Sequence, residues 1–250
     1  MRTVAVIGAG QMGAGIAQVS AGAGYHVFLS DIDLARAEAG KAGIAKQLDR
    51  QVEKGKMTGE NANALLGRIR PVADFEKMAE AELIIEAATE REEIKRKIFA
   101  DVGNVLNDQA VLASNTSSIP ITRLAQGSPD AARFIGVHFF NPVPVMGLIE
   151  VIRGLATSAE TVTKIEAYGA ALGKRLVFAN DAPGFIVNRV LMPMLNEACF
   201  ALGEGVATIP DIDAACQLGL NHPMGPLTLA DFIGLDTCLD ITNVLFNSTG

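Results

Sequence analysis

Short apolar runs alternate with longer amphipathic segments along the first two-thirds of the chain. The apolar runs are typical of buried strands, and the amphipathic segments between them are typical of helices. The runs lie at residues 3–7, 26–30, 83–88, 110–114, 134–139, 148–152 and 175–179, and the clearest helical segments at residues 11–24 and 33–55. Near-continuous apolar strands that alternate with helices predict an α/β fold with a Rossmann-like, doubly wound and mostly parallel sheet.

The pattern changes after the stretch "DAPG" at residues 181–184. From Phe185 onward strand-like alternation is gone, and helical patterns follow. They cover residues 185–205, 209–219 and 224–246. Because a Pro-Gly pair at such a change is typical of a domain boundary, we predict two domains. Residues 1–181 form the domain with the sheet, and residues 182–250 form a smaller, all-helical domain.

Composition narrows the class of protein. A net charge of -7 argues against nonspecific binding to nucleic acid or to anionic membranes. No apolar run is long enough to span a bilayer, and the first strand begins so close to Met1 that we expect no signal peptide. Cys199, Cys216 and Cys238 lack CxxC spacing, which favours reduced thiols over disulfides or a structural metal site. We expect a cytoplasmic protein without a metal.

A glycine loop, "VAVIGAGQMGAG", follows the first strand and opens the first helix. Gly8 allows a tight turn, Gly10 lets a pyrophosphate approach the backbone, and Gly13 lets the helix pack against the strand. The helix N-terminus, with Gln11 and Met12, would face the phosphates. The pattern predicts a dinucleotide site, although flavin would use the same loop, and a turn without any ligand is the other alternative.

Asp31 ends the second strand, where a carboxylate would bind a ribose 2′-hydroxyl. A carboxylate at this position repels a 2′-phosphate, which favours NAD over NADP. Asp33 and Arg36 lie close by in the sequence and leave the NADP alternative open.

The stretch "GVHFFNPVPVMGLIEVI", residues 136–152, predicts a strand, a proline-broken turn and a second strand. Glu150 stands alone in the second apolar run, and burial of an unpaired carboxylate costs several kcal/mol. His138 ends the first run, and an imidazole is a natural acid–base for the proton that accompanies hydride transfer. A carboxylate would orient such an imidazole, so we infer that Glu150 is its partner. Alternatively, His138 is an ordinary loop histidine, and Glu150 binds a backbone amide or Arg153.

A polar cluster follows the strand at residues 110–114 in the stretch "LASNTSSIPITRLA". In open α/β sheets ligands bind beyond the carboxyl ends of the strands, so we expect the cluster near His138. Its side chains could hold a substrate oxygen or a nicotinamide. The alternative is helix capping, for which Ser118 before Pro120 would suffice. The cluster consists of Ser114, Asn115, Thr116, Ser117 and Ser118.

Five motifs in order resemble the short-chain L-3-hydroxyacyl-CoA dehydrogenases, and most closely the bacterial 3-hydroxybutyryl-CoA dehydrogenases. They are the glycine loop, "ASNTSS", "GVHFFNPVPVMGLIEVI", "DAPGFIVNR" and "HPMGPLTLADFIGLD". The resemblance runs from residue 1 to residue 250. It implies NAD-dependent oxidation of an (S)-3-hydroxyacyl-CoA to the 3-ketoacyl-CoA, and the reverse reduction of acetoacetyl-CoA.

The resemblance also implies roles for single residues. His138 is the general base and Glu150 orients it. Ser117 and Asn188 contact the substrate, Ser117 at its 3-oxygen, and both belong to the expected catalytic set. Asn141 helps to position the site near His138.

Further residues are implied to contact the cofactor or the substrate. Glu90 and Lys95 match positions that contact NAD, although Arg91 or Glu92 stands where the family has an asparagine. Asn115, Ser117 and Asn141 complete the expected cofactor set. Lys54 and Lys56 are candidates for the phosphates of CoA, unless they only mark a solvated helix end.

The resemblance also implies an oligomeric state, and it leaves alternative functions open. The family's helical domain forms the dimer interface, so we expect a homodimer. The family usually continues past Gly250 with more helix and a basic tail, which implies that part of the helical domain lies outside this chain. Related enzymes oxidise sugar acids or carnitine, and a non-catalytic NAD-binding protein is a second alternative.

Overall fold

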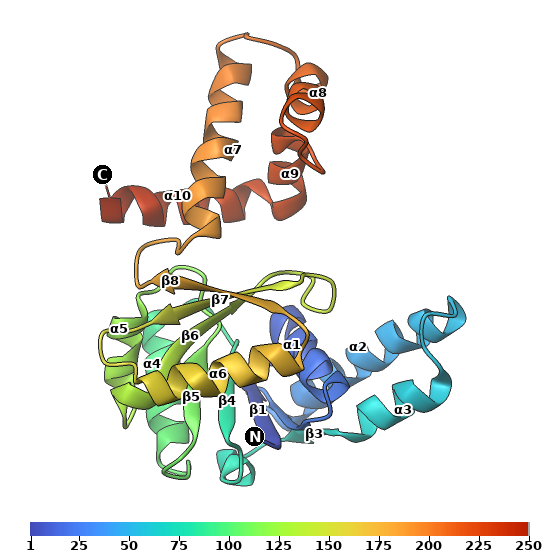
Figure 1. The fold of residues 1–250 in the computed structure, drawn as a ribbon, viewed down its shortest axis with the longest axis vertical. Coiled ribbons are helices and arrows are strands. Elements are labelled where there is room, and N and C mark those ends of the chain that lie inside the picture. Colours follow the sequence, from blue (N-terminus) through green and yellow to red (C-terminus); the bar gives the residue numbers. More distant parts are fainter. Residues whose placement is uncertain (250) are drawn as a thin grey trace. The chain divides into compact units, whose positions relative to one another are not determined.

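The computed structural model describes residues 1–249. The chain divides into two compact units, Met1–Asp181 and Ala182–Gly250, which are described separately below (Figure 1). The first unit contains the whole sheet, and the second consists of helices.

Within residues 1–249, eight strands form one sheet in the order β3-β2-β1-β4-β5-β6-β7-β8. Neighbouring strands are parallel except for β6 and β7, which form an antiparallel pair. The predicted mostly parallel, doubly wound sheet is therefore confirmed. The strands are β1 (Thr3–Ile7), β2 (His26–Ser30), β3 (Ile69–Val72), β4 (Leu83–Glu86), β5 (Val111–Ser114), β6 (Phe134–Phe139), β7 (Leu148–Arg153) and β8 (Arg175–Asn180).

Helices cover both faces of the sheet (Figure 1). They bury the central strands on both sides, which is why those strands are continuous apolar runs, as in Leu83–Glu86 and Phe134–Phe139. The helices are α1 (Gln11–Gly22), α2 (Leu34–Glu53), α3 (Gly59–Gly67), α4 (Glu92–Gly103), α5 (Ile121–Leu124) and α6 (Ala159–Ala171), with short 3₁₀ turns at η1 (Phe75–Met78), η2 (Ala125–Gly127) and η3 (Ala131–Arg133).

Two details differ from the sequence analysis. The edge strand β3 was not predicted, because Arg70 and Pro71 interrupt its short apolar pattern. Proline is tolerated at a sheet edge, where its missing N–H breaks no ladder. The suggestion that Ser118 caps the helix after Pro120 is wrong. The first N–H groups of α5, at Ile121 and Thr122, donate to the two carboxylate oxygens of Asp181, each at 2.7 Å.

The helical unit contains α7 (Val187–Gly203), α8 (Ile209–Gly219), α9 (Pro226–Ile233) and α10 (Leu235–Thr249). The segment 224–246 thus forms two helices where one pattern was expected. Gly234, with a φ of +101°, ends α9, a conformation that glycine adopts without strain. In residues 1–249 no helix combines the length and the hydrophobicity that a membrane span requires.

Candidate active site

The three glycines of the motif, Gly8 and Gly10 in the loop between β1 and α1 and Gly13 in the first turn of α1, meet different steric demands. A Cβ atom on Gly8, whose φ is +100°, would lie 2.5 Å from the carbonyl oxygen of Ala87. One on Gly13 would lie 1.8 Å from the carbonyl oxygen of Gly8. Gly10, the residue that precedes the first turn of α1, has nothing within 4 Å of such an atom. The loop is therefore tightly packed at two glycines and open at the third, where a ligand can approach the backbone.

A cavity of about 830 Å³ opens beside this loop. Gly8, Gly10 and Gln11 line it, together with apolar side chains of α4, whereas Met12 and Gly13 are not among its lining residues. Its volume is within the range of small-molecule and cofactor sites. The N-terminus of the twelve-residue helix α1 lies at the same place, and its N–H groups favour an anion. These features fit a dinucleotide with its pyrophosphate at the glycine loop.

Asp31 joins the glycine loop to the rim of the cavity. Its Oδ2 accepts the backbone N–H of Ala9 at 2.6 Å, and its Oδ1 accepts the N–H of Ile32 at 2.8 Å. Arg36 lies 3.8 Å from Oδ1. A carboxylate has about four acceptor sites, so Asp31 can hold the loop and still accept ribose hydroxyls.

His138 and Glu150 are brought together by the antiparallel register of β6 and β7, which places them directly opposite each other. The distance between His138 Nδ1 and Glu150 Oε2 is 2.7 Å. Glu150 is fully buried, and His138 is only 7% exposed. A buried carboxylate needs a partner, and here that partner is a titratable imidazole. With Nδ1 on the carboxylate, Nε2 is the nitrogen that can exchange a proton with a substrate.

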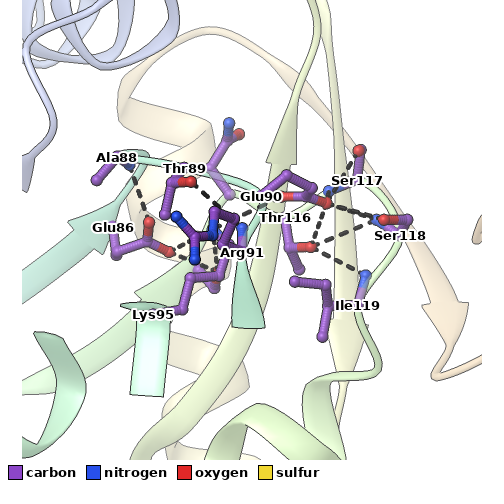
Figure 2. Close-up of polar contacts among 12 residues, drawn as sticks. Glu86, Ala88, Thr89, Glu90, Arg91, Lys95, Thr116, Ser117, Ser118 and Ile119 are labelled. Atoms are coloured by element: carbon purple, nitrogen blue, oxygen red, sulfur yellow. Dashed lines mark hydrogen bonds and ion pairs between the residues drawn. The ribbon is translucent and has the colours of Figure 1, made fainter. Parts of the chain in front are cut away.

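Glu90, in the loop between β4 and α4, gathers the polar cluster that follows β5 (Figure 2). Its Oε1 accepts the hydroxyl of Thr116 at 2.6 Å. The same oxygen accepts the N–H and the hydroxyl of Ser117, at 2.8 and 3.1 Å, and those of Ser118, both at 3.0 Å. Burial raises the pKa of Glu90, but the Lys95 ammonium and these hydrogen bonds outweigh it, so its pKa lies below the ordinary value.

Asn115 links this cluster to the strand that carries the histidine. Its side-chain oxygen accepts the backbone N–H of Phe139 at 2.8 Å. In the parallel pairing of β5 and β6, Ser114 lies opposite Gly136. The loop with Ser117 and the end of β6 with His138 therefore meet at the same edge of the sheet, as the sequence analysis expected.

Two family profiles together match almost the whole chain. The sequence profile described as "3-hydroxyacyl-CoA dehydrogenase, NAD binding domain" matches residues 3–182, and the one described as "3-hydroxyacyl-CoA dehydrogenase, C-terminal domain" matches residues 184–250. The chain belongs to the 3-hydroxyacyl-CoA dehydrogenase family. It is an oxidoreductase whose cofactor is NAD, so the predicted family, enzyme class and cofactor are confirmed.

Relatives of this dehydrogenase carry a consistent name. A 3-hydroxybutyryl-CoA dehydrogenase from Bradyrhizobium diazoefficiens is 51% identical over 98% of this chain and 84% of its own length. A probable 3-hydroxybutyryl-CoA dehydrogenase from Bacillus subtilis is 48% identical over 100% of this chain and 87% of its own. The crystal structure of (S)-3-hydroxybutyryl-CoA dehydrogenase PaaH1 from Ralstonia eutropha has a TM-score of 0.96 and 47% identity, and the match covers 99% of this chain and 88% of that one.

Lys95 of the dehydrogenase is almost completely buried, with 1% of its side chain exposed. Its Nζ lies 2.6 Å from Glu86 Oε2, 3.4 Å from Ser114 Oγ and 3.7 Å from Glu90 Oε2. Neither Glu90 nor Lys95 is among the residues that line the cavity. Their contact with NAD therefore stays a prediction, and the structure shows them first as members of an internal polar network.

Glu86 was missed by the sequence analysis. It ends the apolar run "LIIE" of β4 and is fully buried. The same signal, a carboxylate inside an apolar strand, singled out Glu150 and could have found Glu86 as well. The expected run at residues 83–88 placed Glu86 inside the strand, whereas the observed strand ends at Glu86.

The remaining predicted residues lie in other places. Lys54 and Lys56 are exposed in the turn between α2 and α3, two helices that project from the sheet (Figure 1). Asn141 is exposed in the loop after β6, and the peptide bond that follows it, to Pro142, is cis. Asn188 belongs to the helical unit, where it is buried in the first turn of α7.

Proposed function

We propose that this dehydrogenase interconverts (S)-3-hydroxybutyryl-CoA and acetoacetyl-CoA with NAD and NADH. The observation that carries the proposal is the buried pair of His138 and Glu150, 2.7 Å apart at the end of β6. An alcohol can lose hydride to a nicotinamide only if a base takes its proton, and this pair supplies one. The names of the relatives favour the four-carbon acyl group.

In this proposal bound NAD⁺ supplies the hydride acceptor. His138 accepts the proton of the 3-hydroxyl through Nε2, and its Nδ1–H continues to donate a hydrogen bond to Glu150, whose negative charge stabilises the imidazolium. In the reduction the protonated His138 returns the proton to the 3-keto oxygen. Glu150 fixes the imidazole in the orientation and tautomer that both directions need.

The other predicted residues take supporting roles. Ser117 hydrogen-bonds the 3-oxygen, and Asn188 provides a second polar contact to the substrate. Asn115 and Asn141 hold the site around the nicotinamide. These assignments rest on their place at the ends of β5 and β6 and, for Asn188, on the family motif alone.

We assign NAD binding to residues 1–181 and substrate binding to the helical residues 182–250, with CoA phosphates at Lys54 and Lys56. Both lysines are exposed, and no ion pair to either is found within residues 1–249. Ammonium groups bind phosphate oxygens with strong, charge-assisted hydrogen bonds. A cationic turn on an acidic protein would suit a polyanionic substrate.

We also propose a cytoplasmic homodimer that associates through the helical unit. Large apolar side chains are exposed on that unit, and exposed apolar patches are typical of association surfaces. The exposed apolar residues include Val190, Phe200, Phe232, Leu235, Leu239 and Phe246. Light scattering of the purified chain would measure its mass in solution.

The proposed compartment rests on the cysteines. Three free cysteines suit a reducing compartment.

The test of the proposed reaction is spectrophotometric. Acetoacetyl-CoA is mixed with the enzyme and NADH, and the loss of NADH absorbance is followed. We expect rapid oxidation of NADH and a much slower reaction with NADPH, because the Asp31 carboxylate would repel a 2′-phosphate. A sugar acid and carnitine, each offered with NAD⁺, serve as competing substrates. Faster turnover of either than of 3-hydroxybutyryl-CoA would contradict the proposal.

A further inference from the structure

Glu86 is a buried carboxylate that the proposed reaction does not use. It ends β4, and its side chain is fully buried. Its Oε1 accepts the backbone N–H of Ala88 at 2.9 Å, and its Oε2 accepts the Ser114 hydroxyl at 2.9 Å and the Lys95 ammonium at 2.6 Å. A buried charge with this many donors is held in one place, because any movement would break several hydrogen bonds.

Glu86 and Ser114 together fix the position of Lys95. They lie opposite each other on the neighbouring strands β4 and β5, and both contact the ammonium. The sheet itself therefore determines where this positive charge is. At that position the ammonium lies 3.7 Å from Glu90 Oε2, close enough to attract the second carboxylate (Figure 2).

Glu90 in turn holds the loop with Ser117. One oxygen, Oε1, receives five donors from Thr116, Ser117 and Ser118. A carboxylate oxygen has only about two acceptor sites, so the five contacts compete. The longest, at 3.1 Å, is the one from the Ser117 hydroxyl. A substrate oxygen can replace Glu90 as the acceptor of this hydroxyl, while the other contacts keep the loop in place.

We propose that Glu86 is a positioning residue of the dehydrogenase, which acts through Lys95 and Glu90 on the hydroxyl of Ser117. The inference rests on the proposed function, in which that hydroxyl contacts the 3-oxygen of the substrate. Glu86 fixes the ammonium, and the ammonium fixes the carboxylate of Glu90. Glu90 in turn holds the Ser117 hydroxyl where it can contact the substrate oxygen. A purely structural role for Glu86 would stabilise the sheet without any specific link to Ser117.

A double-mutant cycle distinguishes these two roles. The variants are Glu86→Gln, Ser117→Ala and the combination of both, and kcat is measured with acetoacetyl-CoA and NADH. Glu86→Gln keeps the size of the side chain but removes the charge that fixes Lys95. We expect it to lower kcat by about tenfold to a hundredfold, the scale of a small misplacement of a reacting group. In the Ser117→Ala background the same change should have almost no further effect, because the hydroxyl through which it acts is gone.

Tyr168→Phe provides a matched control. Tyr168 is buried in the same unit, and its hydroxyl lies 2.6 Å from that of Ser20, so its loss removes a buried hydrogen bond of another region. Any effect it has on kcat should multiply with that of Ser117→Ala. If the effects of Glu86→Gln and Ser117→Ala multiply in the same way, the proposal is overturned. An unchanged kcat in a folded Glu86→Gln variant would overturn it too.

Two further measurements keep the outcome clear. If Glu86→Gln does not fold, Ser114→Ala takes its place. It removes one hydrogen bond to Glu86 and the longer contact to Lys95, and it should show a smaller effect that again vanishes in the Ser117→Ala background. Turnover by the unmodified enzyme tests the proposed reaction on its own. An active enzyme with an additive cycle refutes the role of Glu86 alone, whereas an enzyme without acetoacetyl-CoA turnover refutes the proposed function.

Discussion

Two buried carboxylates lie in the same sheet and bind different nitrogen groups. Glu150 on β7 and Glu86 on β4 are both fully buried. Each accepts a short contact from a nitrogen, at 2.7 Å from His138 and at 2.6 Å from Lys95. The distances between nitrogen and oxygen in the two pairs are therefore nearly the same, but the partners differ in chemistry. An imidazole gains and loses a proton near neutral pH, whereas an ammonium ordinarily keeps its proton.

This difference shows how one sheet provides both a proton carrier and a rigid frame. The proton carrier is His138 with Glu150, and the frame consists of Glu86, Lys95, Glu90 and the polar cluster. At β6 and β7 the carboxylate stabilises a charge that appears and disappears during the reaction. At β4 and β5 it holds a permanent charge, which organises Glu90 and the polar cluster. The two sites meet where Asn115 binds the backbone of Phe139. A hydrogen bond therefore connects the polar cluster to the residue that follows His138.

The largest expected effect comes from His138→Gln. The amide can still donate to Glu150, but it cannot carry a proton, so kcat with acetoacetyl-CoA should fall by about 10⁴-fold, the upper end of general acid–base catalysis. The affinity for NADH, measured by its fluorescence, should hardly change, because the glycine loop and Asp31 are untouched. His26→Gln is the matched control, since His26 is an exposed histidine at the start of β2. Loss of NADH binding in a folded His138→Gln variant would show that the assigned role is wrong.

The next effect, from Glu150→Gln, compares the two carboxylates directly. The imidazole remains, but its positive form loses the negative partner, and we expect kcat to fall by about 10³-fold. Glu86→Gln removes a buried charge of the same kind and should cost at least tenfold less than that. Equal losses in the two variants would show that both carboxylates contribute equally to turnover, and the contrast between proton carrier and frame would have to be abandoned.

The strands and the pair of residues around His138 could largely be predicted from the sequence. The limits of β1, β2 and β6 agree with the apolar runs, because both faces of these strands are buried and burial is a local requirement. The pairing of His138 with Glu150 could be inferred because two strands joined by a short turn form a hairpin. For these predictions it was enough to know the local hydrophobic pattern and that the two strands follow each other in the chain.

The frame could not be predicted, because its contacts join distant parts of the chain. Glu86 and Ser114 are 28 positions apart, and Asp181 caps α5 from 60 positions away. A sequence pattern does not say which strand will lie next to which, so Ser118 was offered as a possible cap and the contacts of Glu86 were not foreseen. The order of strands in the sheet supplies this missing information.

The smallest expected effect concerns Glu90, the member of the frame that solvent reaches. The pKa of Glu90 lies below its ordinary value, because Lys95 and the hydroxyls of the cluster outweigh its burial. The stabilisation that a depressed pKa gives is fully present above the pKa of the unfolded chain, which is about 4.3 for glutamate. This contribution is lost as the pH falls from there through the lower pKa of the folded protein. Glu90→Gln should therefore lower Tm at pH 7, lower it by less at pH 4, and hardly change it once the pH is below the pKa of the folded protein. The side chain is 42% exposed, so solvent screens the charges and the difference at pH 7 should be only about 1–2 °C.

Glu166→Gln, at an exposed position of α6, provides the control and should show no such pH dependence. A destabilisation by Glu90→Gln that is as large at pH 4 as at pH 7 would show that the carboxylate holds Ser117 by shape and not by charge.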